Sequence, residues 1–345
     1  MNFTKLNKLK AGDKVAILSP SFAAPGQWPH MYELGLMRLR DIFGLEPVEF
    51  PTTKKLGASK EERSADLIRA FEDASIKAVI TSIGGDDQVT YVKDLPVALF
   101  KTHPKPFFGY SDNTHLANFL WLAGIPSYYG ASLHTQFALN GCMNPFTVGY
   151  IKKALFESGE FELTSSEMFN DIGLDWNDSS NMAKELAYEK NDGWFWDGEG
   201  RVAGRTWGGC LESIDEMLRH GSRIPELSEF EDIVLFTETC EEISPASYVF
   251  RVYRALGERG ILERVKAVLV GRPKSWEFDK QKNPDERKEY RKEQRETITQ
   301  VVRMYNKTAP IVQNMDFGHT EPQIPLPYGG MVRIDSLSKK VFAEF

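Results

Sequence analysis

The first 123 residues alternate short apolar runs with amphipathic segments, and this alternation limits the fold more than any other feature. Buried strands separated by helices favour a mostly parallel sheet that is covered by helices on both faces. We therefore predict an α/β fold that begins with a doubly wound, mostly parallel sheet. The predicted strands are Lys14–Ser19, Glu46–Phe50, Lys77–Ile83 and Pro106–Tyr110, and the predicted helices are Met31–Phe43, Glu61–Ser75 and Asn113–Ala123.

A second set of elements begins near Arg201, as expected for a chain of 345 residues, which is long for one compact core. We predict an N-terminal α/β domain at residues 1–160 and a C-terminal α/β domain with its own sheet at 201–345. The predicted helices of the second part are Cys210–Leu218, Pro245–Leu256 and Asp285–Tyr305, and its strands are Asp232–Thr237, Lys266–Val270, Met331–Ile334 and Val341–Phe345.

Residues 161–200 have a different composition, rich in Asn, Asp, Ser and Trp. We interpret them as a linker with a tryptophan-bearing loop that includes Trp176, Trp194 and Trp196. Loops of this length are usually functional or disordered, and tryptophan is an unusual residue in a disordered segment. The composition therefore favours a functional loop.

The overall charge and the cysteines exclude several classes of partner. A net charge of -7 argues against binding a nucleic acid polymer by general attraction to phosphate. Cys142, Cys210 and Cys240 share no close spacing, which argues against a disulfide framework and a zinc site. No apolar signal segment or membrane-length apolar run is visible, so we expect a soluble, cytoplasmic protein without membrane contact.

The segment Gly109-Tyr110-Ser111-Asp112-Asn113 places a serine where a predicted strand meets a helix. A sharp turn there would expose the serine hydroxyl at the carboxyl end of the sheet, where open α/β folds bind ligands. The free N–H groups at the start of the helix would favour a developing negative charge. Ser111 is therefore a candidate nucleophile, although Ser111 or Asp112 could equally serve as an ordinary helix cap.

A second strand end carries Gly84-Gly85-Asp86-Asp87. Two glycines at this position let the backbone approach a ligand closely. The N–H groups of Gly85 and Asp112 are candidates for an oxyanion hole, while an ordinary tight turn is the alternative. A phosphate-binding loop is disfavoured because no G-K-[ST] follows the glycines.

A serine nucleophile needs a base, and the histidines differ in their settings. His319, in Phe317-Gly318-His319-Thr320, follows a strand and is marginally favoured over His134, which lies in an irregular stretch. His115 is on the same helix as Ser111, and we expect it to be structural because helical side chains lean along their own helix.

A histidine base in turn needs an orienting acid. Glu238 ends a predicted buried strand, and Glu241 or Glu242 could take its place.

These stretches together resemble the LD-carboxypeptidases, a family of serine peptidases with a Ser–Glu–His triad. The blocks appear in the family's order over nearly the whole chain, and the nucleophile and Gly-His blocks are fairly specific in combination. The matching blocks are Gly12-Asp13-Lys14-Val15-Ala16, Ser19-Pro20-Ser21, Gly84-Gly85-Asp86-Asp87, Gly109-Tyr110-Ser111-Asp112-Asn113-Thr114, Gly208-Gly209-Cys210-Leu211, Phe236-Thr237-Glu238-Thr239 and Phe317-Gly318-His319-Thr320.

The resemblance implies that Ser111 is the nucleophile, His319 the general base and Glu238 its orienting acid. It also implies an oxyanion hole formed by Gly85 and Asp112, a homodimer, and no metal or other cofactor. Two departures are visible, because Cys210 replaces a usual Asn and Thr237-Glu238-Thr239 replaces a usual Leu-Glu-Asp. The second departure leaves Glu241 open as an alternative to Glu238.

Within the family, the chain resembles the microcin C self-immunity peptidases, which cleave the amide between an aspartate and a nucleotide. The murein-trimming enzymes tend to carry an Arg-Gly-Gly-Tyr-Gly loop, whereas this chain has Ile83-Gly84-Gly85-Asp86-Asp87 and a tryptophan-bearing insert. Trp176 is the first candidate for stacking on a nucleobase, with Trp194 and Trp196 behind it, and the alternative is that all three anchor the loop in the core. Asp86 is a second candidate substrate contact.

The sequence is therefore compatible with three functions. The first is hydrolysis of an aspartyl- or glutamyl-nucleotide amide through an acyl-enzyme, as in toxin immunity and antibiotic resistance. The second is release of D-alanine from a murein tetrapeptide. The third, of another class, is a non-catalytic protein that binds a nucleotide or peptide.

Overall fold

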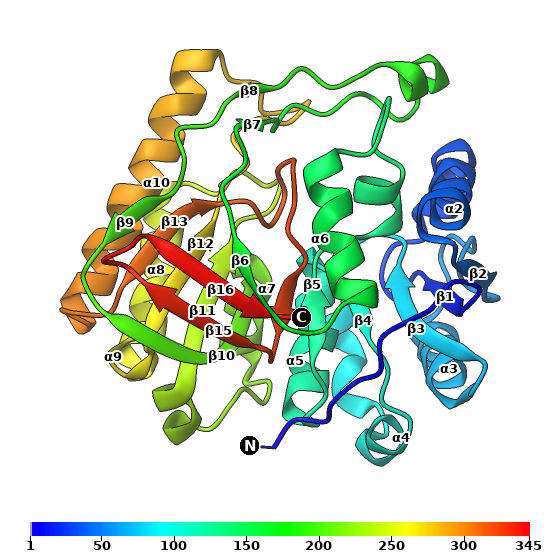
Figure 1. Ribbon diagram of the computed structural model, residues 1–345, viewed down its shortest axis with the longest axis horizontal. Helices are drawn as coiled ribbons and strands as arrows, with labels where there is room; N and C mark the ends of the chain where they lie inside the picture. The colour runs from blue at the N-terminus through cyan, green and yellow to red at the C-terminus, as the bar shows by residue number, and fades with distance from the viewer. Residues whose placement is uncertain (1) are drawn as a thin grey trace.

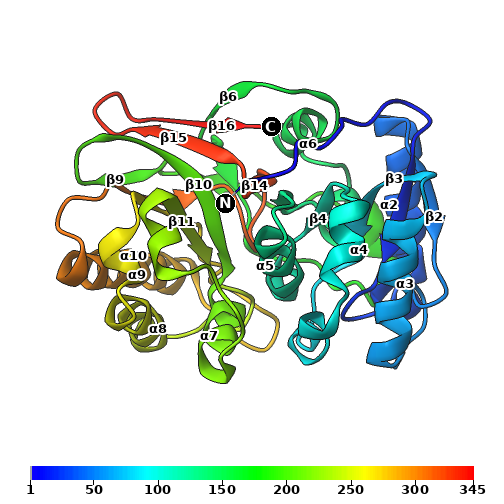
Figure 2. The same ribbon diagram turned by 90° about the horizontal axis from the view of Figure 1, so that it is seen from below.

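The computed structural model describes residues 2–345, and in this part of the chain the main elements are two large sheets that lie side by side (Figures 1 and 2). The first sheet has the strand order β14-β5-β4-β3-β1-β2. Its strands pair in parallel except for β14, which runs antiparallel to β5. Its members are β1 (Lys14–Leu18), β2 (Glu46–Glu49), β3 (Ile76–Thr81), β4 (Phe107–Gly109), β5 (Ser127–Tyr129) and β14 (Leu326–Tyr328).

Helices cover both faces of the first sheet. Successive side chains of β1 point to opposite faces and are buried on each, so each face needs a covering layer. Val15 packs in one cluster with Leu36 of α2, and Ala16 packs in another with Leu67 of α3. The predicted doubly wound, mostly parallel sheet is confirmed. The helices of this half are α1 (Ala24–Gln27), α2 (Pro29–Phe43), α3 (Lys60–Glu72), α4 (Val97–Thr102), α5 (Thr114–Leu122) and α6 (Pro145–Phe156).

The second sheet has the order β6-β16-β15-β10-β11-β12-β13-β9, with a parallel centre and antiparallel edges. Its strands are β6 (Glu160–Leu163), β9 (Phe195–Asp197), β10 (Arg201–Cys210), β11 (Ile233–Glu238), β12 (Ala267–Gly271), β13 (Ile311–Met315), β15 (Met331–Asp335) and β16 (Lys340–Glu344). Its helices are α7 (Leu211–His220), α8 (Ala246–Glu258), α9 (Ile261–Arg264) and α10 (Pro284–Tyr305). The predicted second sheet is therefore present.

Strand β10 is central to this sheet, although the sequence analysis predicted no strand there. Its glycines made the stretch resemble a loop, because glycine weakens an isolated strand. In the fold, a Cβ on Gly208 would lie 1.7 Å from the carbonyl oxygen of Phe236 on the neighbouring strand. This close approach to β11 requires glycine, so the unusual composition reflects packing and not a turn.

Residues 161–200, interpreted as a linker and loop, contain more regular structure than that interpretation implied. Most of β6 and all of β9 lie in this stretch and pair at opposite edges of the second sheet. Two further strands, β7 (Met168–Phe169) and β8 (Glu189–Lys190), pair with each other.

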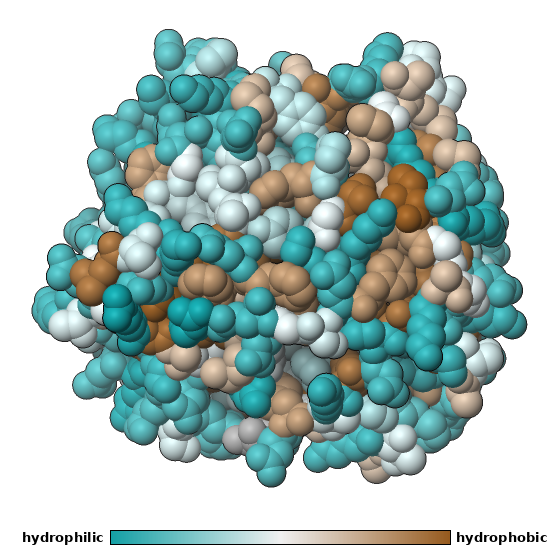
Figure 3. Space-filling view, viewed as in Figure 1, coloured by the Kyte–Doolittle hydropathy of each residue, from teal (hydrophilic) through white to brown (hydrophobic). Residues whose placement is uncertain are grey.

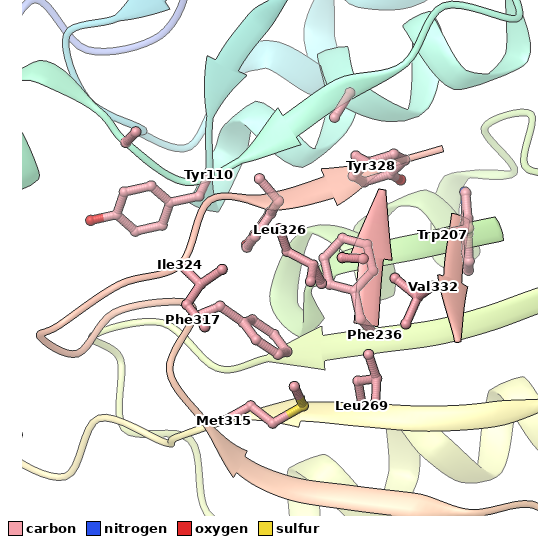
Figure 4. Packing of buried hydrophobic residues seen from close by; sticks show 14 of the residues in the cluster. Tyr110, Trp207, Phe236, Leu269, Met315, Phe317, Ile324, Leu326, Tyr328 and Val332 are labelled. Carbon is pink, nitrogen blue, oxygen red and sulfur yellow. The ribbon is translucent and has the colours of Figure 1, made fainter. Parts of the chain in front are cut away.

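The two sheets meet through apolar packing around β14. Figure 4 shows Leu326 and Tyr328 on this strand between residues of the first half, such as Tyr110, and residues of the second sheet, such as Phe236. The rings of Phe236 and Tyr328 contact edge to face, with centroids 5.3 Å apart. Tyr328 also donates a hydrogen bond to the carbonyl oxygen of Gly208 (3.0 Å). This shared core fixes how the two sheets present their strand ends to each other.

The face of the molecule in Figure 3 is mainly hydrophilic, with hydrophobic side chains scattered between polar ones. Between residues 2 and 345, we find no helix that combines the length and the apolar character needed to cross a membrane.

A buried ion pair ties residues 161–200 to the second sheet. The guanidinium of Arg272 donates to Asp316 (2.6 Å), and both side chains are inaccessible to solvent. Asp316 also accepts hydrogen bonds from the hydroxyl of Ser166 (2.6 Å) and the indole of Trp194 (3.0 Å). A buried charge is tolerated only when it is paired in this way.

We predict that Asp316→Ala lowers the free energy of unfolding by about 3–5 kcal/mol, because it leaves the Arg272 charge buried without a partner. The measurement is urea unfolding followed by tryptophan fluorescence. Glu162→Ala is the control, since Glu162 pairs with Lys340 at the surface (3.0 Å), and removing an exposed pair should change stability by about 0–1 kcal/mol. Equal losses in the two variants would contradict the role assigned to Asp316.

Candidate active site

Ser111 follows β4 directly and has a left-handed backbone, with φ of 63°. A non-glycine residue in this region stores strain of about 1–3 kcal/mol, which the surroundings must offset. Here the side-chain amide of Asn113 donates to the carbonyl oxygens of Tyr110 (2.9 Å) and Ile83 (3.2 Å). The hydroxyl of Thr114 donates to the backbone carbonyl oxygen of Ser111 (2.6 Å). A strained strand-to-helix turn is also the geometry that exposes the nucleophilic serine of α/β-hydrolases.

The alternative role of this turn, an ordinary helix cap, does not fit the hydrogen bonding. No side chain caps α5 or the 3₁₀ turn at Ser111–Asn113 among the described residues. The Asp112 carboxylate instead accepts from the N–H groups of Asp87 (3.2 Å) and Gln88 (3.1 Å). These bonds of Asp112 therefore hold the loop at residues 84–87, called the glycine loop below, against the turn at residues 110–114 that carries Ser111, called the serine turn.

Gly84 and Gly85 approach Ser111 and Ser21 closely because glycine has no side chain. A Cβ on Gly84 would lie 3.0 Å from the Ser111 hydroxyl oxygen, and a Cβ on Gly85, whose φ is 150°, would lie 2.0 Å from that of Ser21. Within residues 2–345, the N–H groups of Gly85 and Asp112 have no hydrogen-bond acceptor. Both N–H groups are therefore available to a ligand beside Ser111.

Glu238 and His319 form a short, buried pair. The Nδ1 atom of His319 lies 2.6 Å from Oε2 of Glu238, whose side chain is inaccessible to solvent. Glu238 is the last residue of β11, and His319 lies in the loop after β13. A Cβ on Gly318 would lie 2.5 Å from Oε2 of Glu238, so glycine is required for this contact.

The charge of Glu238 controls the protonation of His319. Burial disfavours the charged ring, but the charge and hydrogen bond of Glu238, together with the smaller effect of the Glu241 charge, outweigh it and raise the pKa of His319 above its ordinary value. The other ring nitrogen, Nε2, lies 3.2 Å from Glu241. The Glu241 side chain is 55% exposed, whereas the Glu238 side chain is inaccessible to solvent, so Glu238 is the buried one of the two carboxylates that contact the ring.

Tyr129 was missed by the sequence analysis, yet it connects the two halves of the site. Its hydroxyl donates to Oε1 of Glu238 (2.5 Å) and accepts from the N–H of Ser111 (3.2 Å). Burial and the charge of Glu238 raise the pKa of Tyr129, so the phenol stays protonated and can donate. The available signal was the short run Ser127-Tyr128-Tyr129, whose tyrosines favour a strand, followed by Gly130, since a strand that ends in glycine also precedes Gly84-Gly85.

The other two histidines considered have different surroundings. His115 lies 3.2 Å from Glu216 and 3.6 Å from Asp112, which agrees with the predicted structural role. His134 is fully buried in the wall of the cavity described next, where burial lowers its pKa to about 4.

A cavity of about 500 Å³ adjoins Ser111 and His319, and Trp176 lies in its wall. The Trp176 ring contacts Trp28 edge to face, with centroids 5.1 Å apart, and Trp28 also lines the cavity. Sequence analysis missed Trp28, which is far from the tryptophan-bearing segment in the chain. Trp194 and Trp196, considered behind Trp176, pack instead against the core of the second sheet.

A second hollow, of about 940 Å³, meets this cavity at Ser111, and we name it the acidic groove. Asp86, predicted as a substrate contact, is exposed and lines this groove and not the tryptophan cavity. The other acidic or thiol-bearing residues of the groove are Asp112, Cys210, Glu212, Asp215, Glu216, Cys240, Glu241 and Glu242.

Comparison with known families decides the kinship of this fold. Residues 15–130 match the LD-carboxypeptidase N-terminal domain, and residues 203–334 match the LD-carboxypeptidase C-terminal domain. The chain belongs to the LD-carboxypeptidase family. The predicted resemblance is confirmed, and membership supports a hydrolase of the serine carboxypeptidase type.

The relatives include immunity proteins. The Escherichia coli microcin C7 self-immunity protein MccF is 25% identical over 285 residues, which are 81% of this chain and 77% of that protein. A crystal structure of an MccF-like protein from Streptococcus pneumoniae in complex with AMP is 26% identical, with a TM-score of 0.84 over 96% of this chain and 98% of that chain. MccF in complex with aspartyl sulfamoyl adenosine, at 23% identity, has the same fold, with a TM-score of 0.85 over 99% and 98% of the two chains.

We predict that Glu238→Gln lowers the pKa of His319, because burial then acts without the compensating charge. The measurement is an NMR titration of the imidazole protons. Since the folded-state pKa is raised, the pair stabilises the fold most below pH of about 6.5 and loses this contribution as pH rises through the folded value. The deficit in stability of the variant should therefore be larger in acid than in alkali.

Glu241→Gln is the control for this titration, because Glu241 faces the other ring nitrogen and is more exposed. It should lower the His319 pKa by less than Glu238→Gln does. A larger decrease from Glu241→Gln would make Glu241 the main partner of His319.

Proposed function

We propose that the chain is a serine carboxypeptidase-type amide hydrolase, with Ser111 as nucleophile, His319 as general base and acid, and Glu238 as orienting acid. The proposal rests on a chain of contacts that starts at the strained Ser111 turn. The N–H of Ser111 donates to the Tyr129 hydroxyl, which donates to Glu238. Glu238 in turn contacts Nδ1 of His319. A nucleophile, a base and a buried orienting group are the parts that covalent catalysis requires.

In this mechanism, Nε2 of His319 exchanges its contact with Glu241 for one with the Ser111 hydroxyl and takes its proton. The serine oxygen attacks the amide carbonyl, and the N–H groups of Gly85 and Asp112 receive the oxyanion. One such donor is worth about 3 kcal/mol in the transition state. His319 then protonates the leaving amine, and water hydrolyses the acyl-enzyme through the same base.

We predict that a fluorophosphonate probe labels Ser111 and that Ser111→Ala abolishes labelling and lowers turnover by about 10³-fold or more, with unchanged folding. Intact-mass spectrometry and peptide mapping locate the adduct. Ser213→Ala is the matched control, because Ser213 also lines the acidic groove and its hydroxyl lies 3.5 Å from the carbonyl oxygen of Ser111. Absence of labelling in the unaltered chain would favour the non-catalytic binding protein.

For the substrate, we propose an aspartyl- or glutamyl-nucleotide amide. Trp176 and Trp28 give the cavity an aromatic wall, and stacking on a nucleobase is worth about 1–3 kcal/mol per base. The complexes of related proteins with AMP and with aspartyl sulfamoyl adenosine point to the same class of ligand. Lys274 is a cation in the cavity wall that could face a carboxylate, although it also pairs with Glu277 (2.6 Å).

We predict that purified protein releases the nucleotide amine from an aspartamide-linked adenylate and releases no D-alanine from a murein tetrapeptide, as measured by mass spectrometry. Trp176→Ala should raise KM for the adenylate about 5–150-fold, as expected for the loss of one stacking contact, whereas Trp176→Phe should retain most of the affinity. Release of D-alanine alone would assign the chain to murein trimming and would leave the tryptophans with a structural role.

A further inference from the structure

Two of the three cysteines lie together beside the Ser111 turn, although 30 residues separate them in the chain. Cys210 ends β10, and its register partner on β11 is Glu238, so Cys240 follows two residues beyond the end of the neighbouring strand. Both cysteines are buried, whereas Cys142 is exposed. The sequence spacing gave no sign of this pairing because it depends on the register of two parallel strands.

A carboxylate completes the group. Glu212 lies in the first turn of α7, and its Oε2 atom is 3.2 Å from the sulfur of Cys210. The two sulfur atoms and a Glu212 oxygen all lie within 4.8 Å of one another. The same carboxylate accepts hydrogen bonds from the N–H of Cys240 (3.3 Å) and the hydroxyl of Ser244 (2.9 Å), which fix its orientation.

We infer that Cys210, Glu212 and Cys240 form a binding site for a thiophilic divalent metal ion, with Zn²⁺ as the best match. Sulfur ligands select such ions over Mg²⁺ and Ca²⁺, which prefer oxygen. Three protein ligands with a fourth position left open is the arrangement found in zinc sites that also bind water or a small ligand.

The acidic groove provides the entry path that such a site requires, because all three residues line it. Ser244, which orients Glu212, supplies the outer hydrogen bond that metal-ligating carboxylates commonly have. The site also adjoins the serine turn, since the N–H of Cys210 donates to the hydroxyl of Thr114 (3.0 Å), which donates to the carbonyl oxygen of Ser111 (2.6 Å). A metal ion bound here lies within the same groove as the serine.

The test is titration of the fully reduced full-length chain with Co²⁺, followed by displacement with Zn²⁺. We expect one Co²⁺ per chain with the intense thiolate-to-metal absorption that only sulfur ligands produce. Cys210→Ser and Cys240→Ser should each reduce this absorption and weaken binding more than the roughly 10–100-fold that loss of an outer hydrogen bond causes. Weak Co²⁺ binding without thiolate absorption would overturn the proposal.

Three further variants separate ligation from misfolding. Glu212→Gln keeps both sulfur ligands, so it should weaken binding while retaining the thiolate absorption, and Ser244→Ala should weaken binding about 10–100-fold. Cys142→Ser is the matched control and should bind as the unaltered chain does. Thermal unfolding of each metal-free variant checks its fold, and unchanged Co²⁺ spectra in folded Cys240→Ser would also overturn the proposal. None of these measurements depends on hydrolysis, so their outcome is separate from that of the proposed function.

Discussion

The buried carboxylate of Glu238 is the constraint on which the arrangement of the site depends. A negative charge in the interior is tolerated only when hydrogen bonds and opposite charge compensate for its lost hydration. Tyr129, from the first sheet, and His319, from the second, supply these contacts. The small size of Gly271 and Gly318 leaves the room that the carboxylate occupies. The same side chain therefore orients the histidine and adds a polar contact between the two halves to the apolar core around β14.

The fold was predictable where local pattern and tertiary environment agree. Lys14–Ser19 and Lys77–Ile83 are apolar because the strands are buried on both faces, and the structure contains them as β1 and β3. The pattern failed at β10, where packing against a neighbouring strand requires glycine. The local sequence pattern could not indicate this strand, because its glycines are required by a contact with Phe236, which lies far along the chain.

The candidate site was predictable in its motifs but not in its supporting contacts. The motifs alone pointed to Ser111, Glu238 and His319. In the structure, Ser111 and His319 line one cavity, and Glu238 pairs with His319. Their catalytic roles stay proposals. Tyr129 and Trp28 were missed because their positions depend on non-local packing. Asp86 lines the acidic groove, and its contact with substrate stays a prediction. The predicted homodimer and cytoplasmic location stay predictions.

Strand β14 belongs by sequence to the C-terminal part of the chain, but it forms an edge of the first sheet. A fragment that ends after β5 would lack β14, so the N–H and C=O groups of β5 that bond to β14 would be exposed and could pair with another chain. The chain can therefore not be divided between the two segments that match the N-terminal and the C-terminal family domains. During synthesis on the ribosome, the first sheet cannot be completed until nearly the whole polypeptide has emerged, and a truncated product is expected to be prone to aggregation.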